Sequence, residues 1–101
     1  MTSIRKVAII GGSRIPFVRS NTSYSHASNM DMLSATLQGV VNRFDLSGQR
    51  LGEVAAGAVM KHSRDFNLAR EATLNSGLSL QTPAYDVQQA CGTGLEAAIL
   101  V

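Results

Sequence analysis

A single cysteine, Cys91, is the residue of this 101-residue sequence best suited to covalent chemistry. The segment AYDVQQA precedes Cys91. Gly92 and Gly94 follow it, at the start of the apolar stretch LEAAILV. A thiol at the N-terminus of a helix lies near free backbone N–H groups and the positive end of the helix dipole, and both favour the thiolate. The same N–H groups can stabilise the oxyanion that forms when a thioester is attacked. The pattern therefore predicts a nucleophile.

A structural role for the same cysteine is the alternative. A lone cysteine among Ala and Leu residues is most often a small core residue. In that case the sequence would encode an α/β module that acts in binding or assembly without catalysis. The reactivity of the Cys91 thiol as a function of pH would distinguish the two roles.

Four other polar residues are weaker candidates for chemistry. His26 and His62 lie in polar segments, and we expect both to be solvated side chains. Arg14 and Arg70 are of the type that binds phosphates, but we expect them to tie loops together instead. The Gly-Gly-Ser turn near the N-terminus is not a dinucleotide fingerprint, because GxGxxG is missing.

The elements that must position Cys91 alternate between strands and helices. Short β-branched or apolar runs predict strands, and amphipathic runs predict helices. The expected order is a strand at 6–10, a helix from 29 to shortly before 48, a strand at 53–60, a helix at 67–77, a strand at 84–90 and a final helix from 92. This βαβαβα order predicts a layered α/β fold with a mostly parallel sheet. Cys91 would lie at the carboxyl end of the third strand, where such sheets usually carry their sites.

Local signals give further expectations for these elements. Asn29 and Asn67 are the expected N-caps of the first two helices, and Gly48 and Gly77 lie at or beyond their ends. Gly57, inside the second strand, indicates a close backbone approach. The expected buried face of the first helix consists of Leu33, Leu37, Val40, Val41 and Phe44. Asp86 and Glu96 form no obvious carboxylate pair.

Composition limits the classes of function. The chain is 45% hydrophobic and 16% charged, which is too apolar for intrinsic disorder. Its net charge of +2 and its scattered basic residues do not indicate a nucleic-acid partner. One cysteine allows no disulfide within the chain, which fits a reducing compartment. The N-terminus lacks a signal-peptide core, and no apolar run is long enough to span a membrane, so we expect a cytoplasmic protein.

Three segments resemble the thiolase family. CGTGLEAAI, starting at Cys91, is similar to its nucleophile motif Cys-Gly/Ala-Ser/Thr-Gly-Leu-x-Ala. KVAIIGGSRIPF resembles its first strand and Arg-Thr-Pro-Phe turn, with Ile15 in place of Thr. NLAREATLNSGL resembles its Asn-x-Ala-Arg-x-x-x-Leu-x-x-Gly helix. The segments occur in the family's order and cover nearly the whole chain. One departure is Gln88, where the family often has Asn.

The resemblance implies an acyltransferase that cleaves 3-ketoacyl-CoA with coenzyme A and runs the reverse Claisen condensation. Cys91 would be the acylated residue. Coenzyme A would be a cosubstrate, with no metal or prosthetic group, and the full-length protein would be a homo-oligomer, a dimer or tetramer. The Ser-rich segment and the QQAC turn are similar to the fatty-acid β-oxidation type.

The resemblance also bears on domain organisation. Residues 1–101 would be the N-terminal part of a thiolase N-domain, cut within the helix after Cys91, because LEAAILV carries no helix stop signal. The family's catalytic His and second Cys lie further downstream, so we expect these residues alone to be inactive. A ketoacyl-ACP synthase, which also uses a Cys at a helix start, is an alternative, although the Asn-x-Ala-Arg helix favours thiolase.

Overall fold

Two short parallel strands form the centre of the structure, a computed structural model that describes residues 3–101. β1 spans Val54–Ala56 and β2 spans Ala84–Asp86, with Val54 opposite Ala84 and Ala56 opposite Asp86. The helix that connects them is the crossover that a parallel pair requires. The prediction of an α/β fold with a parallel sheet is confirmed.

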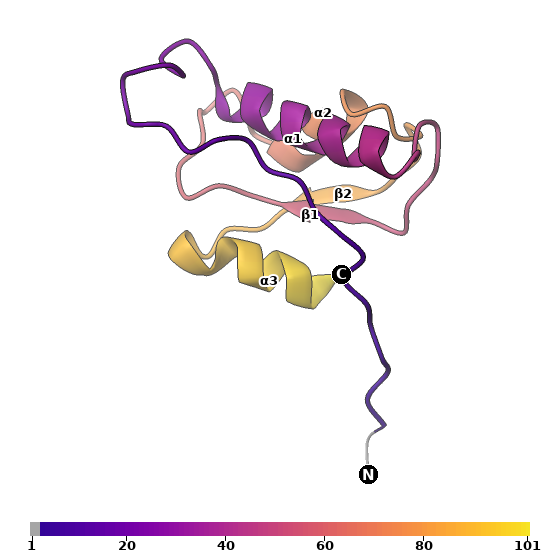
Figure 1. Cartoon of the computed structure of the whole chain (residues 1–101). Coiled ribbons are helices and arrows are strands. Elements are labelled where there is room, and N and C mark those ends of the chain that lie inside the picture. Colours follow the sequence, from indigo (N-terminus) through magenta and orange to yellow (C-terminus); the bar gives the residue numbers. More distant parts are fainter. Residues whose placement is uncertain (1–2) are drawn as a thin grey trace.

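Helices cover both faces of this pair of strands (Figure 1). α1 (Asn29–Arg43) and α2 (Leu68–Leu74) pack against each other on one face, and α3 (Thr93–Leu100) lies on the other. A short 3₁₀ turn, η1 (Ala90–Gly92), leads directly into α3. Among residues 3–101, no helix combines the length and the apolar character that crossing a bilayer requires.

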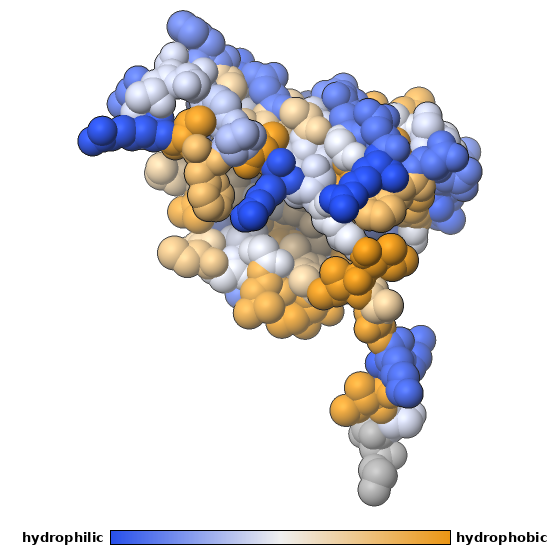
Figure 2. Space-filling view, viewed as in Figure 1, coloured by the Kyte–Doolittle hydropathy of each residue, from blue (hydrophilic) through white to orange (hydrophobic). Residues whose placement is uncertain are grey.

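The predicted first strand at 6–10 is wrong. This segment has no strand pairing, and its apolar side chains are exposed, Val7 by 88% and Ile9 by 93%. It runs away from the helices, with hydrophobic side chains on its surface (Figures 1 and 2). A β-branched run becomes a strand only where a neighbouring strand accepts and donates its backbone hydrogen bonds. Within residues 3–101 this run has no such neighbour.

The N-cap of α1 is Ser28, one residue before the predicted Asn29. The Ser28 hydroxyl accepts a hydrogen bond of 3.1 Å from the Asp31 N–H, and the Asp31 carboxylate accepts one of 2.9 Å from the Ser28 N–H. This reciprocal pair is a capping box. The helix ends at Arg43, well before Gly48, and the left-handed residue Asp45 (φ 54°) follows its end.

The apolar face of α1 is confirmed. Val41 is fully buried, and the other four expected residues, Leu33, Leu37, Val40 and Phe44, are half-buried. α1 packs on α2, which supplies most of the core. The buried apolar residues of the core are Val41, Leu68, Ala69, Ala72 and Leu78.

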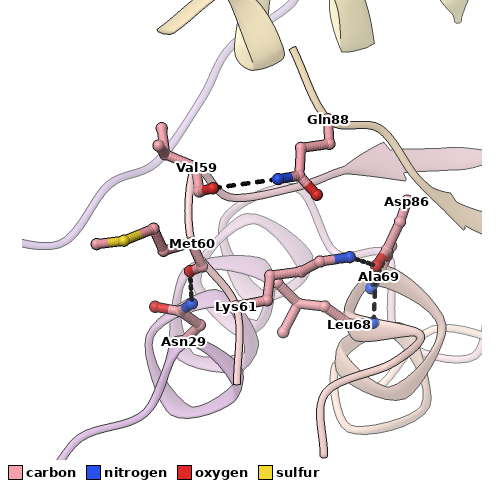
Figure 3. A network of polar contacts seen from close by, with 8 residues as sticks. All are labelled: Asn29, Val59, Met60, Lys61, Leu68, Ala69, Asp86 and Gln88. Atoms are coloured by element: carbon pink, nitrogen blue, oxygen red, sulfur yellow. Dashed lines mark hydrogen bonds and ion pairs between the residues drawn. The ribbon is translucent and has the colours of Figure 1, made fainter. Parts of the chain in front are cut away.

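The start of α2 depends on a residue distant in sequence. Asn67 occupies the N-cap position as expected, but its side chain makes no capping hydrogen bond. The carboxylate of Asp86 takes this role, accepting hydrogen bonds of 3.2 Å from the Leu68 N–H and 2.7 Å from the Ala69 N–H (Figure 3). At the other end, Gly77 has a φ of +94°, so it is the left-handed residue expected after the helix.

Gly57 follows β1 and makes the close backbone approach that the sequence indicated. A methyl group at this position would lie 1.9 Å from the carbonyl oxygen of Val87 and 2.8 Å from Cγ2 of Thr93. No side chain fits in that space without moving the backbone. The absence of a side chain at Gly57 thus lets the segment that leads to Cys91 pass directly beside β1.

Candidate active site

Cys91 is the middle residue of η1, between the carboxyl end of β2 and the first turn of α3. Its thiol is exposed. Cys91 is therefore not part of the core that residues 3–101 form. The sequence placed Cys91 at the carboxyl end of a strand at 84–90, but β2 ends at Asp86, so residues 87–89 and the start of the 3₁₀ turn separate Cys91 from the strand. The first N–H groups of an α-helix have no partner within the helix and can stabilise negative charge, although that of Thr93 is already donated to the Ala90 carbonyl.

The turn that presents Cys91 is sharp. Ala90 has a φ of 46°, in the left-handed region, which costs a non-glycine residue roughly 1 kcal/mol. The turn is closed by a hydrogen bond of 2.8 Å from the Gly92 N–H to the Gln89 carbonyl. The Thr93 hydroxyl accepts a hydrogen bond of 2.9 Å from the Gln89 N–H and donates one of 2.8 Å to the Ala90 carbonyl. These bonds hold Ala90 in its unfavourable conformation.

Gln88, where the family often has Asn, connects this turn to the loop after β1. Its Nε2 donates a hydrogen bond of 3.2 Å to the carbonyl of Val59 (Figure 3). The next carbonyl in that loop, of Met60, accepts from Nδ2 of Asn29 in α1. The ammonium group of Lys61 then pairs with Asp86. The loop is therefore held from α1, from β2 and from the segment before Cys91.

The two histidines are exposed, as the sequence predicted. His26 lies in a turn before α1. His62 and Gln88 line the same surface hollow of about 570 Å³, together with residues of the loop after β1. Within residues 3–101, no hydrogen bond joins Cys91 to either histidine. The structure thus brings His62 near Gln88, but it forms no Cys–His pair among these residues.

Arg70 holds a loop, as predicted. Its Nη1 and Nη2 donate hydrogen bonds of 2.7 Å each to the carbonyls of Thr82 and Leu80, in the segment that leads into β2. Arg14 differs from this prediction. It is exposed beside a surface hollow that it shares with Ile15, and no hydrogen bond from it is found in the described part of the chain.

Two acidic side chains near the turn lie on opposite faces of β2. Asp86 points to α2 and Lys61. Neighbouring strand residues face opposite ways, so Tyr85 points toward the side of α3. Burial, together with the charges of Glu53 and Glu96, raises the pKa of Tyr85. Glu96 belongs to α3, which lies on the other face of the strands from α2. Glu96 and Asp86 are therefore apart and form no carboxylate pair.

Sequence reasoning missed two residues that shape this region. Thr93 was seen only as part of the CGTG motif, and the pairing of its hydroxyl could not be read from its type. Asp86 gives no local signal at all, because its partners Leu68 and Ala69 lie 18 and 17 residues away. Across residues 3–101, no three His, Cys, Asp or Glu side chains converge to hold a metal ion.

Comparison with known proteins identifies relatives over almost the whole chain. Residues 7–101 match the family "Thiolase, N-terminal domain". A 3-ketoacyl-CoA thiolase of Photorhabdus laumondii is 35% identical over 92 residues, which are 91% of this chain and 21% of that protein. A 3-ketoacyl-CoA thiolase of Vibrio cholerae is 33% identical over 96 residues, 95% of this chain and 22% of that protein.

The human mitochondrial trifunctional enzyme subunit beta is 36% identical over 89 residues, covering 88% of this chain and 19% of that protein. The chain thus spans about a fifth of the length of the relatives it matches. The family match includes the turn with Cys91 and both strands. On this match, the chain belongs to the thiolase family, in the family's N-terminal domain.

Proposed function

We propose that Cys91 is the acyl-accepting nucleophile of a 3-ketoacyl-CoA thiolase. The observation that carries this proposal is the exposed Cys91 thiol at the junction of β2 and α3. Membership of the thiolase family supports it, as do relatives that are named 3-ketoacyl-CoA thiolase. These relatives also favour thiolysis over the reaction of a ketoacyl-ACP synthase.

In the proposed reaction, the Cys91 sulfur attacks the 3-keto carbon of a 3-ketoacyl-CoA. The bond between carbons 2 and 3 then breaks, its electron pair stays on carbon 2, and a proton joins that carbon to give acetyl-CoA. The shortened acyl group remains on Cys91 as a thioester. The thiol of a second coenzyme A attacks this thioester, releases the shortened acyl-CoA and restores the free cysteine. The reverse sequence is the Claisen condensation.

The turn around Cys91 contributes position and polarity to these steps. The N-terminus of α3 directs N–H groups and the positive end of its dipole toward this region. They would stabilise the thiolate and the negative charge that develops on the attacked carbonyl oxygen. Cys91 lies in the short 3₁₀ turn η1 and is exposed there, so an acyl group can reach its sulfur.

Further parts of the proposal concern the whole protein. Coenzyme A acts as a cosubstrate, and no metal or prosthetic group takes part in acyl transfer. The protein acts in the cytoplasm as a homo-oligomer, a dimer or tetramer. The base of the family reaction is a residue other than His26 and His62, since neither histidine falls in a family His motif. The family's second cysteine is a residue other than Cys91.

Trapping of the acyl-enzyme tests the proposal directly. The full-length protein is incubated with a 3-ketoacyl-CoA in the absence of free coenzyme A, and its peptides are analysed by mass spectrometry. We expect the acyl mass on the peptide that contains Cys91. Cys91→Ala should abolish thiolysis, with an unfolding midpoint close to that of the parent protein.

Two outcomes would contradict this function. Acylation of another residue, with full thiolysis by Cys91→Ala, would remove Cys91 from the reaction. Condensation with malonyl-ACP, without coenzyme A-dependent cleavage, would identify a ketoacyl synthase instead.

A further inference from the structure

We propose that Thr93 is a positioning residue for the Cys91 sulfur. It acts through two hydrogen bonds of its hydroxyl group across the turn that carries Cys91. This inference rests on the proposed function of Cys91. Thr93 is the first residue of α3 and is only 6% exposed. It makes no contact with substrate in this proposal, and it acts through the backbone on the N-terminal side of the cysteine.

Both hydrogen-bonding functions of the Thr93 hydroxyl are used within the turn. The oxygen accepts the hydrogen bond of 2.9 Å from the Gln89 N–H, and the hydroxyl hydrogen is donated to the Ala90 carbonyl at 2.8 Å. The backbone N–H of Thr93 also donates to the Ala90 carbonyl. Thr93 therefore holds the peptide group between Gln88 and Gln89 and the one between Ala90 and Cys91.

The two hydrogen bonds of the Thr93 hydroxyl matter because the backbone conformation of Ala90 that they hold is unfavourable. Ala90, directly before Cys91, has a φ of 46°. Such a conformation persists only where the surroundings impose it. Without the Thr93 hydroxyl, the Gln89 N–H loses its partner, and the Ala90 peptide can rotate toward a more favourable φ. Rotation there would displace the Cα of Cys91 and thus the sulfur.

The methyl group of Thr93 contacts the residue that follows β1, so the turn is also packed against the sheet. This methyl lies beside Gly57, where an added methyl would come within 2.8 Å of Cγ2. A β-branched side chain has few χ1 rotamers, and the rotamer that the two hydroxyl bonds fix also places the methyl against the residue after β1. The sulfur is in this way positioned relative to the strand pair and not by η1 alone.

Two substitutions separate the hydroxyl from the methyl. Thr93→Val keeps the shape and removes the hydroxyl, whereas Thr93→Ser keeps the hydroxyl and removes the methyl. In the full-length protein, we expect Thr93→Val to lower kcat on the order of tenfold to a hundredfold with KM little changed, as for a misplaced reacting group. We expect Thr93→Ser to retain kcat within about threefold, because the serine hydroxyl can make the same two bonds.

A second readout is the rate of alkylation of Cys91 by iodoacetamide across pH, followed on its peptide by mass spectrometry. Thr93→Val should slow alkylation and change its pH profile, and Thr93→Ser should not. If Thr93→Val does not fold, Thr93→Ala compared with Thr93→Ser differs by the same hydroxyl and gives the same test.

The proposal is overturned if Thr93→Val keeps the parent kcat and alkylation profile. It is equally overturned if Thr93→Ser loses as much as Thr93→Val, since that result would assign Thr93 a packing role. Full thiolysis by Cys91→Ala would reject the proposed function alone. In that case, the alkylation comparison still decides whether Thr93 places the sulfur.

Discussion

The carboxylate of Asp86 accepts a hydrogen bond of 2.7 Å from the backbone N–H of Ala69, so the end of β2 caps the helix that crosses over it. The other carboxylate oxygen accepts from the Leu68 N–H and pairs with Lys61. One side chain thus joins the strand that leads to Cys91, the helix that forms the core, and the loop after β1 (Figure 3).

Removal of this carboxylate should destabilise the fold. We expect Asp86→Ala to lower the free energy of unfolding by about 1 to 3 kcal/mol, because two helix N–H groups and Lys61 lose their partner. Asp86→Asn, which keeps one acceptor oxygen, should lose less. Urea denaturation of both variants measures the difference. A loss below about 0.5 kcal/mol for Asp86→Ala would show that the cap contributes little.

Asp31 should make stability depend on acid pH. Hydrogen bonds from the backbone N–H and then the hydroxyl of Ser28, with a smaller contribution from Arg64, hold the pKa of this carboxyl below its usual range, although desolvation opposes them. A carboxyl whose pKa is lower in the folded state contributes stability above its unfolded pKa and loses it as pH falls through the folded pKa.

At neutral pH, the parent protein should therefore have a larger free energy of unfolding than the Asp31→Asn variant. The difference should shrink below about pH 4, where the unfolded carboxyl begins to bind protons. Urea denaturation of both proteins at several pH values between neutrality and strong acid measures it. A difference that stays constant throughout would argue against the charged capping box.

Gly57 should tolerate no side chain. Gly57→Ala places a methyl 1.9 Å from the Val87 carbonyl oxygen, so β1 or the segment after β2 must move. We expect a loss of about 1 to 3 kcal/mol in unfolding free energy, in the range of overpacked sites. Gly52→Ala is the matched control, because nothing lies within 4 Å of a methyl there. Equal stability of the two variants would contradict the close approach.

Arg70 should support structure and not bind coenzyme A. Lys cannot reproduce the fork that reaches both the Thr82 and Leu80 carbonyls, so Arg70→Lys should lower unfolding free energy by about 1 kcal/mol or more. In the full-length protein, the KM for coenzyme A should stay unchanged. A raised KM with unchanged stability would instead assign Arg70 to the phosphates.

Features governed by neighbouring residues could be predicted from the sequence. The amphipathic face of α1 follows from side-chain spacing, and Gly57 indicated a close approach because glycine lacks a side chain. The place of Cys91 between a strand and a glycine-containing helix start was also predictable, since both elements have short-range signals. The resemblance to the thiolase motifs also rests on short runs of neighbouring residues, such as CGTGLEAAI.

Other features were decided only by contacts between distant segments. The apolar run at 6–10 has strand composition, but it forms no strand among the described residues because backbone pairing needs a partner edge. Asn67 occupies a cap position, yet Asp86 makes the cap because the chain brings that carboxylate to the helix end. Residue types and spacing determine local conformation, whereas hydrogen-bond partners far apart in sequence exist only once the fold brings them together.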